Sequence, residues 1–99
     1  MPAYLISDLS VRDAEAYQRY RTGAAASIAL YGVRYLARGG AIESLEGSWG
    51  AQTIVIVEFP NIEQARAWYR SPEYALALEA RDQALARNLI LVEGVSDTA

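Results

Sequence analysis

The side chains available for chemistry in this chain are arginines, tyrosines, tryptophans and carboxylates. The 99 residues include no cysteine and no histidine, and all nine basic residues are arginine. Disulfides, thiolate catalysis, cysteine or histidine ligation of metals and histidine ligation of haem are therefore excluded. The acidic residues lack the loop spacing of a calcium site, and Gly39-Gly40 lacks the spacing of a phosphate-binding loop. We therefore expect neither a metal nor a cofactor.

Arg81 is the most informative of these side chains. It falls in the apolar stripe of a predicted helix, whose members recur at steps of four, three and four: Tyr74, Leu78, Arg81 and Leu85. A guanidinium in such a stripe must find an acceptor, because a buried unpaired charge is too costly to keep. Arg81 could clamp the carboxylate of a ligand through its planar fork of donors. It could equally form an internal salt bridge or carbonyl bond that ties the helix down, with only its stem packed.

Glu58 is the candidate general base. It follows two isoleucines in strict alternation, so the three side chains share one face of a strand. A desolvated carboxylate there would have a raised pKa suited to accepting a proton. Alternatively, Glu58 forms a structural ion pair at the rim of the sheet with Arg34 or Arg38, which share a parity on the preceding strand. Gly39-Gly40 leaves open the register between these two strands, so either arginine could be the partner. Glu93, near the end of the last strand, could likewise be a general base or a member of a structural ion pair.

An aromatic string, Trp68-Tyr69-x-Ser71-x-x-Tyr74, offers a second kind of site. Trp68, Tyr69 and Tyr74 could line a pocket for a flat apolar ligand, with phenolic hydroxyls to orient it. They could equally form the core between helix and sheet. Ser71 is expected to cap a helix rather than act as a nucleophile, because no histidine or lysine is present to activate it.

The elements that position these residues alternate between strands and helices. Strands are expected at 4–9, 33–37, 52–59 and 88–95, with 41–45 continuing the second. Helices are expected from the Asp13 cap (Ser10 is the alternative) to residue 31 before Gly32, from the Asn61 cap to residue 69, and over 72–87. This order predicts a single domain over residues 1–99 with an α+β, ferredoxin-like β-α-β-β-α-β fold, in which helices cover one face of one antiparallel sheet.

The third and fourth predicted strands are apolar on both faces. Val55 and Val57 point one way while Ile54 and Ile56 point the other, and the last strand has the same two-sided pattern. A sheet that is apolar on the face away from its helices must be covered, and the chain has no further element to cover it. We therefore expect a homodimer that packs sheet against sheet. Trp49, in a Gly-rich turn, is expected to anchor this interface.

The remaining composition excludes other partners. The net charge is −3 and the arginines are scattered, so no basic patch for nucleic acid is expected. The apolar runs are strand-sized and too short to span a membrane. The start, Met1-Pro2-Ala3-Tyr4, lacks the basic and long apolar regions of a signal peptide, which predicts a cytoplasmic protein.

The chain also carries motifs that are specific as a set: Tyr17-x-x-Tyr20, Tyr31-Gly32-Val33-Arg34, Arg38-Gly39-Gly40, Leu45-Glu46-Gly47-x-Trp49, Val57-Glu58-Phe59-Pro60, Ala67-Trp68-Tyr69-x-Ser71-x-x-Tyr74, Arg81 and Val92-Glu93-Gly94. This set, which spans nearly the whole chain, resembles the DUF1330 family of small bacterial proteins in the dimeric α/β-barrel superfamily. Val33 departs from the family's usual Tyr-Gly-Gly. The resemblance implies the fold and a dimer but no activity, because the family has no assigned function.

Two functional hypotheses follow from these residues. In the first, the protein binds, and converts without a cofactor, a small acidic or aromatic metabolite. Arg81 would anchor this ligand, Glu58 would be the base, and the pocket would be lined by Trp68, Tyr69, Tyr74 and Arg38. In the second, the protein is a non-catalytic ligand-sensing or structural dimerisation module, and its polar core residues are structural.

Overall fold

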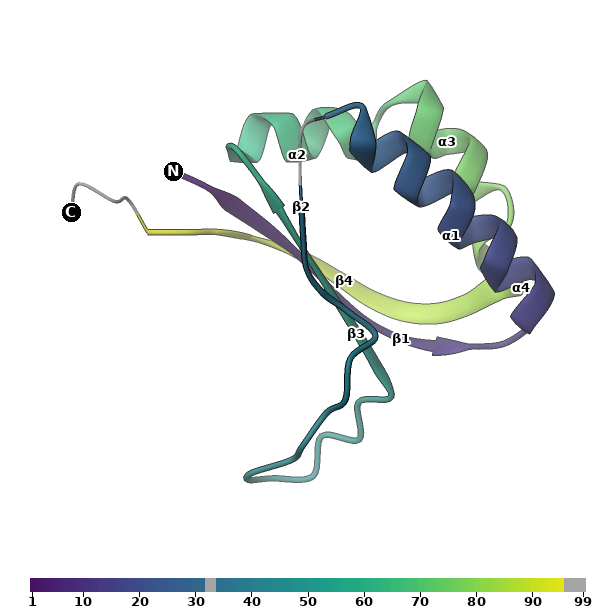
Figure 1. Cartoon of the computed structure of the whole chain (residues 1–99), viewed down its shortest axis with the longest axis vertical. Helices are drawn as coiled ribbons and strands as arrows, with labels where there is room; N and C mark the ends of the chain where they lie inside the picture. Colours follow the sequence, from purple (N-terminus) through teal and green to yellow (C-terminus); the bar gives the residue numbers. More distant parts are fainter. Residues whose placement is uncertain (32–33, 96–99) are drawn as a thin grey trace.

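A four-stranded antiparallel sheet carries all the helices on one of its faces (Figure 1). The computed structural model describes residues 1–31 and 34–95. Its elements are β1 (Ala3–Val11), α1 (Ala14–Ala29), β2 (Arg34–Arg38), β3 (Thr53–Phe59), α2 (Ile62–Tyr69), α3 (Pro72–Leu78), α4 (Arg81–Ala84) and β4 (Leu85–Glu93). The strand order is β2-β3-β1-β4, so the predicted α+β fold is confirmed. No helix in the described ranges is long and apolar enough to cross a membrane.

The three predicted helix caps are confirmed. Side-chain oxygens of Asp13, Asn61 and Ser71 accept the backbone N–H groups of the residues three positions later, at 3.3, 2.8 and 3.1 Å. These bonds satisfy donors that the first turn of each helix cannot pair internally. The starts of α1, α2 and α3 were therefore predictable from local sequence.

Gly23 lies in the middle of α1, where glycine is unfavourable. A Cβ atom built at this position would lie 3.2 Å from the Cβ atom of Ala77 in α3. The missing side chain therefore allows α1 and α3 to pack closely, and this contact places both helices over the same part of the sheet.

The predicted helix over 72–87 is wrong in its second half. α3 ends at Leu78, a single turn forms α4, and β4 begins at Leu85 rather than at residue 88. Leu85 pairs with Val11, and Arg87 pairs with Leu9. Strand pairing with β1 thus overrides helical propensity in this segment, where Leu85, Arg87, Leu89 and Leu91 recur at a period of two. Arg87 consequently belongs to a strand and faces the helices.

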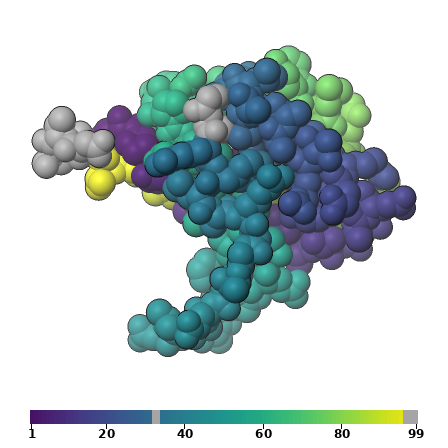
Figure 2. Space-filling view, viewed as in Figure 1, coloured from purple at the N-terminus to yellow at the C-terminus, as the bar shows by residue number. Residues whose placement is uncertain are grey.

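The segment over 41–45 is also not a strand. Residues 39–52 form an extended loop, here called the arm, which projects from the sheet end on the side away from the helices (Figures 1 and 2). Gly39 and Gly47 adopt φ values of 74° and 81°, in the left-handed region that favours glycine. Trp49 in the arm donates from Nε1 to Asp8 Oδ2 at 2.9 Å, although its side chain remains 67% exposed. The predictions for Gly32 and Val33 lie outside the described residues.

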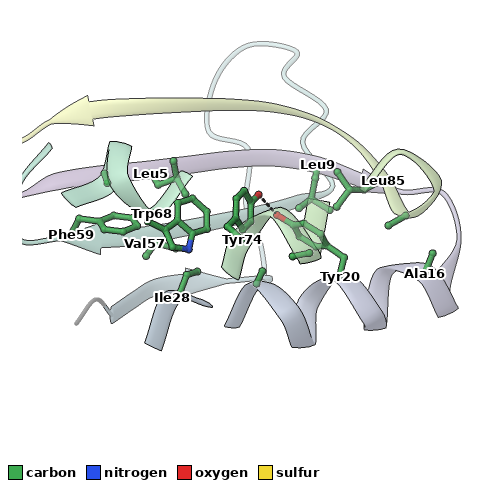
Figure 3. Close-up of a cluster of buried hydrophobic side chains, with 14 residues drawn as sticks. Leu5, Leu9, Ala16, Tyr20, Ile28, Val57, Phe59, Trp68, Tyr74 and Leu85 are labelled. Carbon is green, nitrogen blue, oxygen red and sulfur yellow. Dashed lines mark hydrogen bonds between the residues drawn. The ribbon is translucent and has the colours of Figure 1, made fainter. Parts of the chain in front are cut away.

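The sheet is apolar on both faces, as the sequence predicted. The helix-facing side carries the buried core, which includes Leu5, Leu9, Val57, Phe59 and Leu85 (Figure 3). On the opposite side, Ile6 lies between Ile56 on β3 and Ile90 on β4. Ile90 is 55% exposed. The chain therefore presents to solvent an apolar sheet face, called below the outer face.

Candidate functional site

A cavity of about 230 Å³ lies between α1 and the helix-facing side of the sheet. The central strand β1 contributes Leu5, Ser7 and Leu9 to its floor, and α1 contributes Ala24 and other residues to its roof. Ser7 and Ala24 are small residues at positions where larger side chains would fill the space. The rim includes the exposed Arg38 and Gly39, and the two aromatic residues Tyr17 and Tyr35 are half-buried beside it.

Arg87 holds one end of this cavity together with two phenols. Its Nη1 donates to the Tyr20 hydroxyl at 2.5 Å, and its Nη2 donates to the Tyr74 hydroxyl at 2.6 Å. The two hydroxyls lie 2.6 Å apart, a contact drawn as a dashed line in Figure 3. Tyr20 comes from α1, Tyr74 from α3 and Arg87 from β4, so this triad ties three elements together.

Burial sets the protonation of the triad. Desolvation is the main cause, and the neighbouring Tyr74 a smaller one, that raises the pKa of Tyr20 well above its ordinary value. This phenol therefore stays protonated. Desolvation alone would lower the pKa of Arg87, but the two phenol oxygens outweigh it and the pKa ends above its ordinary value. At neutral pH Arg87 is therefore a cation and Tyr20 a neutral hydroxyl.

Two further arginines line the cavity near its rim. The Arg38 guanidinium lies 4.4 Å from the centre of the Tyr35 ring, and that of Arg21 lies 5.7 Å from the centre of the Tyr17 ring. Burial raises the pKa of Tyr35, against the opposing effect of Arg38.

None of the described residues that line the cavity is acidic. In the described part of the chain the ion pairs are Arg34–Glu58 and Arg81–Asp82, and neither involves a cavity residue. The cavity is therefore electropositive and rich in hydrogen-bond donors, which suits an anion. No described lining side chain is a carboxylate that could accept a proton from a ligand.

Three of the residues expected to bind a ligand are associated with this cavity. Trp68 and Arg38 line it directly. Trp68 Nε1 donates to Ser27 Oγ at 2.9 Å, which fixes the indole in the core. Tyr74 is fully buried behind the lining and contacts Arg87. Tyr69, one residue after Trp68, is exposed and lies outside the cavity.

The structure places Arg81 on the surface and not in a buried apolar stripe. Its side chain is 37% exposed, and Nε lies 3.3 Å from Oδ1 of the neighbouring Asp82. The stripe prediction required one continuous helix, and the break between α3 and α4 removes the geometry on which it rested. Arg81 does not line the cavity.

Glu58 lies on the outer face and does not line the cavity. Its Oε1 accepts from Nε of Arg34 at 2.7 Å, and the Arg34 side chain is 73% exposed. The register explains why Arg34 rather than Arg38 meets Glu58. A bulge between Tyr35 and Ala37 breaks the parity of β2, so Arg38 pairs with Val55 and joins the cavity lining. Glu93 is exposed at the end of β4.

Sequence reasoning missed three residues of this site: Ser7, Tyr20 and Arg87. The signal for Arg87 was present, because Leu85, Arg87, Leu89 and Leu91 alternate at a strand period. Tyr20 was recognised as part of the Tyr17-x-x-Tyr20 motif and not as a partner of Arg87. Ser7 carried no signal, since a serine in a strand is unremarkable until its neighbours are known.

The fold is shared with several solved structures. The RPA0582 protein of unknown function from Rhodopseudomonas palustris matches with a TM-score of 0.77 and 19% identity, covering 96% of this chain and 83% of that chain. A dimeric protein of unknown function with a ferredoxin-like fold from Bacteroides fragilis matches with a TM-score of 0.62 and 14% identity, over 94% and 96% of the two chains. SnoaB, a cofactor-independent oxygenase from Streptomyces nogalater, matches with a TM-score of 0.62 and 11% identity, over 96% and 94%. At these identities the likeness shows the fold alone.

No curated protein matches the sequence. The family model for a domain of unknown function, DUF1330, matches residues 2–95, in agreement with the resemblance seen in the motifs. The chain therefore belongs to the DUF1330 family.

Proposed function

We propose that this protein binds a small anionic molecule with a flat apolar body in the cavity between α1 and the sheet. The observation that carries this proposal is Arg87. Its guanidinium reaches the cavity, is held by the hydroxyls of Tyr20 and Tyr74, and meets no carboxylate among the described residues. A desolvated cation without a counter-charge is costly, and a bound anion would offset that cost.

The size and lining of the cavity favour a single ring with a short acidic substituent. A cavity of about 150 Å³ accommodates benzene, and this cavity of about 230 Å³ is roughly half as large again. Its other end is apolar and includes Leu5, Ile28, Val57 and Trp68. These side chains suit the face and edge of a ring.

Binding without chemistry is the form of the proposal that the lining favours. The described lining residues supply donors and cations but no carboxylate, and the candidate base Glu58 lies on the other face of the sheet. This observation supports the ligand-sensing alternative. Cofactor-independent conversion, the activity named for SnoaB, would require that the ligand itself supplies the basic atom.

The proposed assembly is a homodimer packed through the outer face. The apolar residues on this face, among them Ile6, Ile56 and Ile90, support it, because a contiguous exposed apolar patch typically marks an interface. Trp49, held by Asp8 at the edge of the same face, would extend the contact. The Bacteroides fragilis neighbour with this fold is dimeric. A cytoplasmic location stays a prediction from the sequence.

A thermal-shift screen tests the ligand proposal. The wild-type protein would be heated with small ring acids and with the neutral amide or alcohol of each acid. A ligand that binds only the folded state raises the melting temperature. The proposal expects stabilisation by several acids and not by their neutral counterparts. Equal stabilisation by acids and neutral compounds, or none by any acid, would contradict it.

A further inference from the structure

We propose that Ser7, Tyr20 and Arg87 form a subsite for the carboxylate group of the ligand, and that this subsite selects an ionised acid over the corresponding amide or alcohol. This inference rests on the proposed function, in which the cavity holds an anion. The three residues would bind the acidic group of the ligand, and their unpaired hydrogen-bond donors explain why only a hydrogen-bond acceptor fits there.

The hydrogen atoms of the triad leave one donor free. Arg87 donates to both phenol oxygens, so neither phenol can donate back to it. The contact between the two hydroxyls uses only one of their two hydrogens. Tyr74 is fully buried and does not line the cavity, whereas Tyr20 does.

The direction of the bond between the two hydroxyls follows from this placement. If Tyr20 donated to Tyr74, the Tyr74 hydrogen would be sealed in the core with no acceptor among the described residues, which is unfavourable. Tyr74 therefore donates to Tyr20. The Tyr20 O–H is then the donor of the triad without a partner among the described residues, and Tyr20 lines the cavity, where a ligand can supply the acceptor.

Ser7 supplies a second free donor. Its Oγ is buried on the central strand and has no hydrogen-bond partner in the described part of the chain. The residue lines the same cavity, and because Oγ itself is inaccessible there, the hydroxyl must rotate about the Cα–Cβ bond to donate to a ligand. A buried hydroxyl without a partner is rare in proteins and calls for an explanation, such as a group that binds there.

Sheet register places Ser7 diagonally next to Arg87 on the helix-facing side, and Tyr20 reaches Arg87 from α1. Leu9 pairs directly with Arg87, and Ser7 follows two residues along β1 on the same face. Leu5 is the next residue of that face and pairs with Val57. The floor therefore changes from polar near Arg87 to apolar near Val57. An acidic group at the polar end would direct an attached ring toward the apolar end.

The subsite selects a carboxylate over an amide or an alcohol because it offers more unpaired hydrogen-bond donors than acceptors. A carboxylate carries only acceptor atoms and can receive bonds from Ser7, Tyr20 and Arg87 together. An amide brings N–H groups, and an alcohol brings an O–H group, that would meet other donors. A site built to hydrogen-bond one group rejects analogues that leave its buried polar groups unpaired.

Calorimetric titration with benzoate, benzamide and benzyl alcohol tests this subsite. The wild type should bind benzoate at least about tenfold more tightly than either neutral compound. Ser7→Ala and Tyr20→Phe should each weaken benzoate binding by about ten- to a hundredfold, the range for one hydrogen bond to a charged group, with little change for benzamide. Ser10→Ala, on the same strand but facing the opposite way, is the matched control and should bind like the wild type.

The outcomes separate this inference from the proposed function. Benzoate binding that is unchanged in both Ser7→Ala and Tyr20→Phe would overturn the carboxylate subsite but leave anion binding standing. Failure of benzoate and of every other ring acid to bind the wild type would overturn both. If Tyr20→Phe unfolds, Ser7→Ala decides alone, because it only deletes a hydroxyl that has no described partner.

Discussion

Arg87 donates to the hydroxyl of Tyr20 at 2.5 Å, so this core-facing cation is held by a neutral phenol rather than by a carboxylate of the described residues. A phenol positions a guanidinium without neutralising it. The charge of Arg87 therefore remains available to a ligand, whereas an internal salt bridge would have consumed it.

This relationship predicts that Arg87 contributes little to the stability of the free protein. Arg87→Met deletes two hydrogen bonds but also removes a desolvated charge, so the free energy of unfolding should fall by no more than about 2 kcal/mol, less than the 3–5 kcal/mol that follows the breaking of a buried ion pair. Arg81→Met, which removes an exposed ion pair, should cost about 0–1 kcal/mol. Urea denaturation without ligand measures both. A loss of 3 kcal/mol or more for Arg87→Met would indicate a hidden carboxylate partner.

Two buried serines should respond in opposite directions to alanine. Ser7→Ala removes a hydroxyl without a described partner and should raise the free energy of unfolding by about 1 kcal/mol. Ser27→Ala removes the acceptor of Trp68 Nε1 and should lower it by about 1–3 kcal/mol, because the indole N–H is then left unpaired. Thermal or urea unfolding of the two variants tests this. A destabilised Ser7→Ala would mean that Ser7 is satisfied in the free protein.

Alkaline pH should destabilise the protein through Tyr20. Burial raises the pKa of this phenol in the folded state above the ordinary tyrosine value. The unfolded chain then releases the proton more readily, so the stability from the neutral phenol is fully present below about pH 10 and is lost as the pH rises further. Unfolding experiments between about pH 6 and pH 11 should show a nearly constant stability followed by a decline. The decline should be smaller in Tyr20→Phe, and an equal decline in both proteins would argue against this assignment.

The outer face should hold two chains together. Light scattering at micromolar concentration should give twice the chain mass of 10.9 kDa. Ile56→Asp places a charge at the centre of this face and should give monomers, because a buried unpaired charge is costly. Leu76→Asp, at an exposed position of α3, should leave the dimer intact. A wild-type monomer would contradict the proposed assembly.

The fold was predictable because its determinants are local. Helix caps at Asp13, Asn61 and Ser71 are short-range patterns, and so is the alternation that defines β3. The error over 72–87 has the opposite origin. Leu85 and Arg87 become strand residues because they pair with β1, more than 70 positions away. The local alternation that favours a strand there competes with the helical spacing of Tyr74, Leu78, Arg81 and Leu85, and only the pairing with β1 decides between the two.

The candidate site was harder to predict than the fold for the same reason. The sequence indicated that an arginine would face the core, but the helical periodicity selected Arg81 in place of Arg87. Arg38 lines the cavity because of a bulge between Tyr35 and Ala37, whereas the sequence only left the register open at Gly39-Gly40. Trp68 lines the cavity, and the aromatic string that singled it out is a local pattern of the sequence.

The measurement that tests the central claim most directly is calorimetric titration of benzoate into the wild type, Arg87→Met and Arg81→Met. The wild type and Arg81→Met should bind one benzoate per chain with equal affinity. Arg87→Met should bind it at least about tenfold more weakly, because the charged hydrogen bond to the carboxylate is lost. Equal benzoate affinity in Arg87→Met and the wild type would contradict the claim that Arg87 is the anion-binding residue of this cavity.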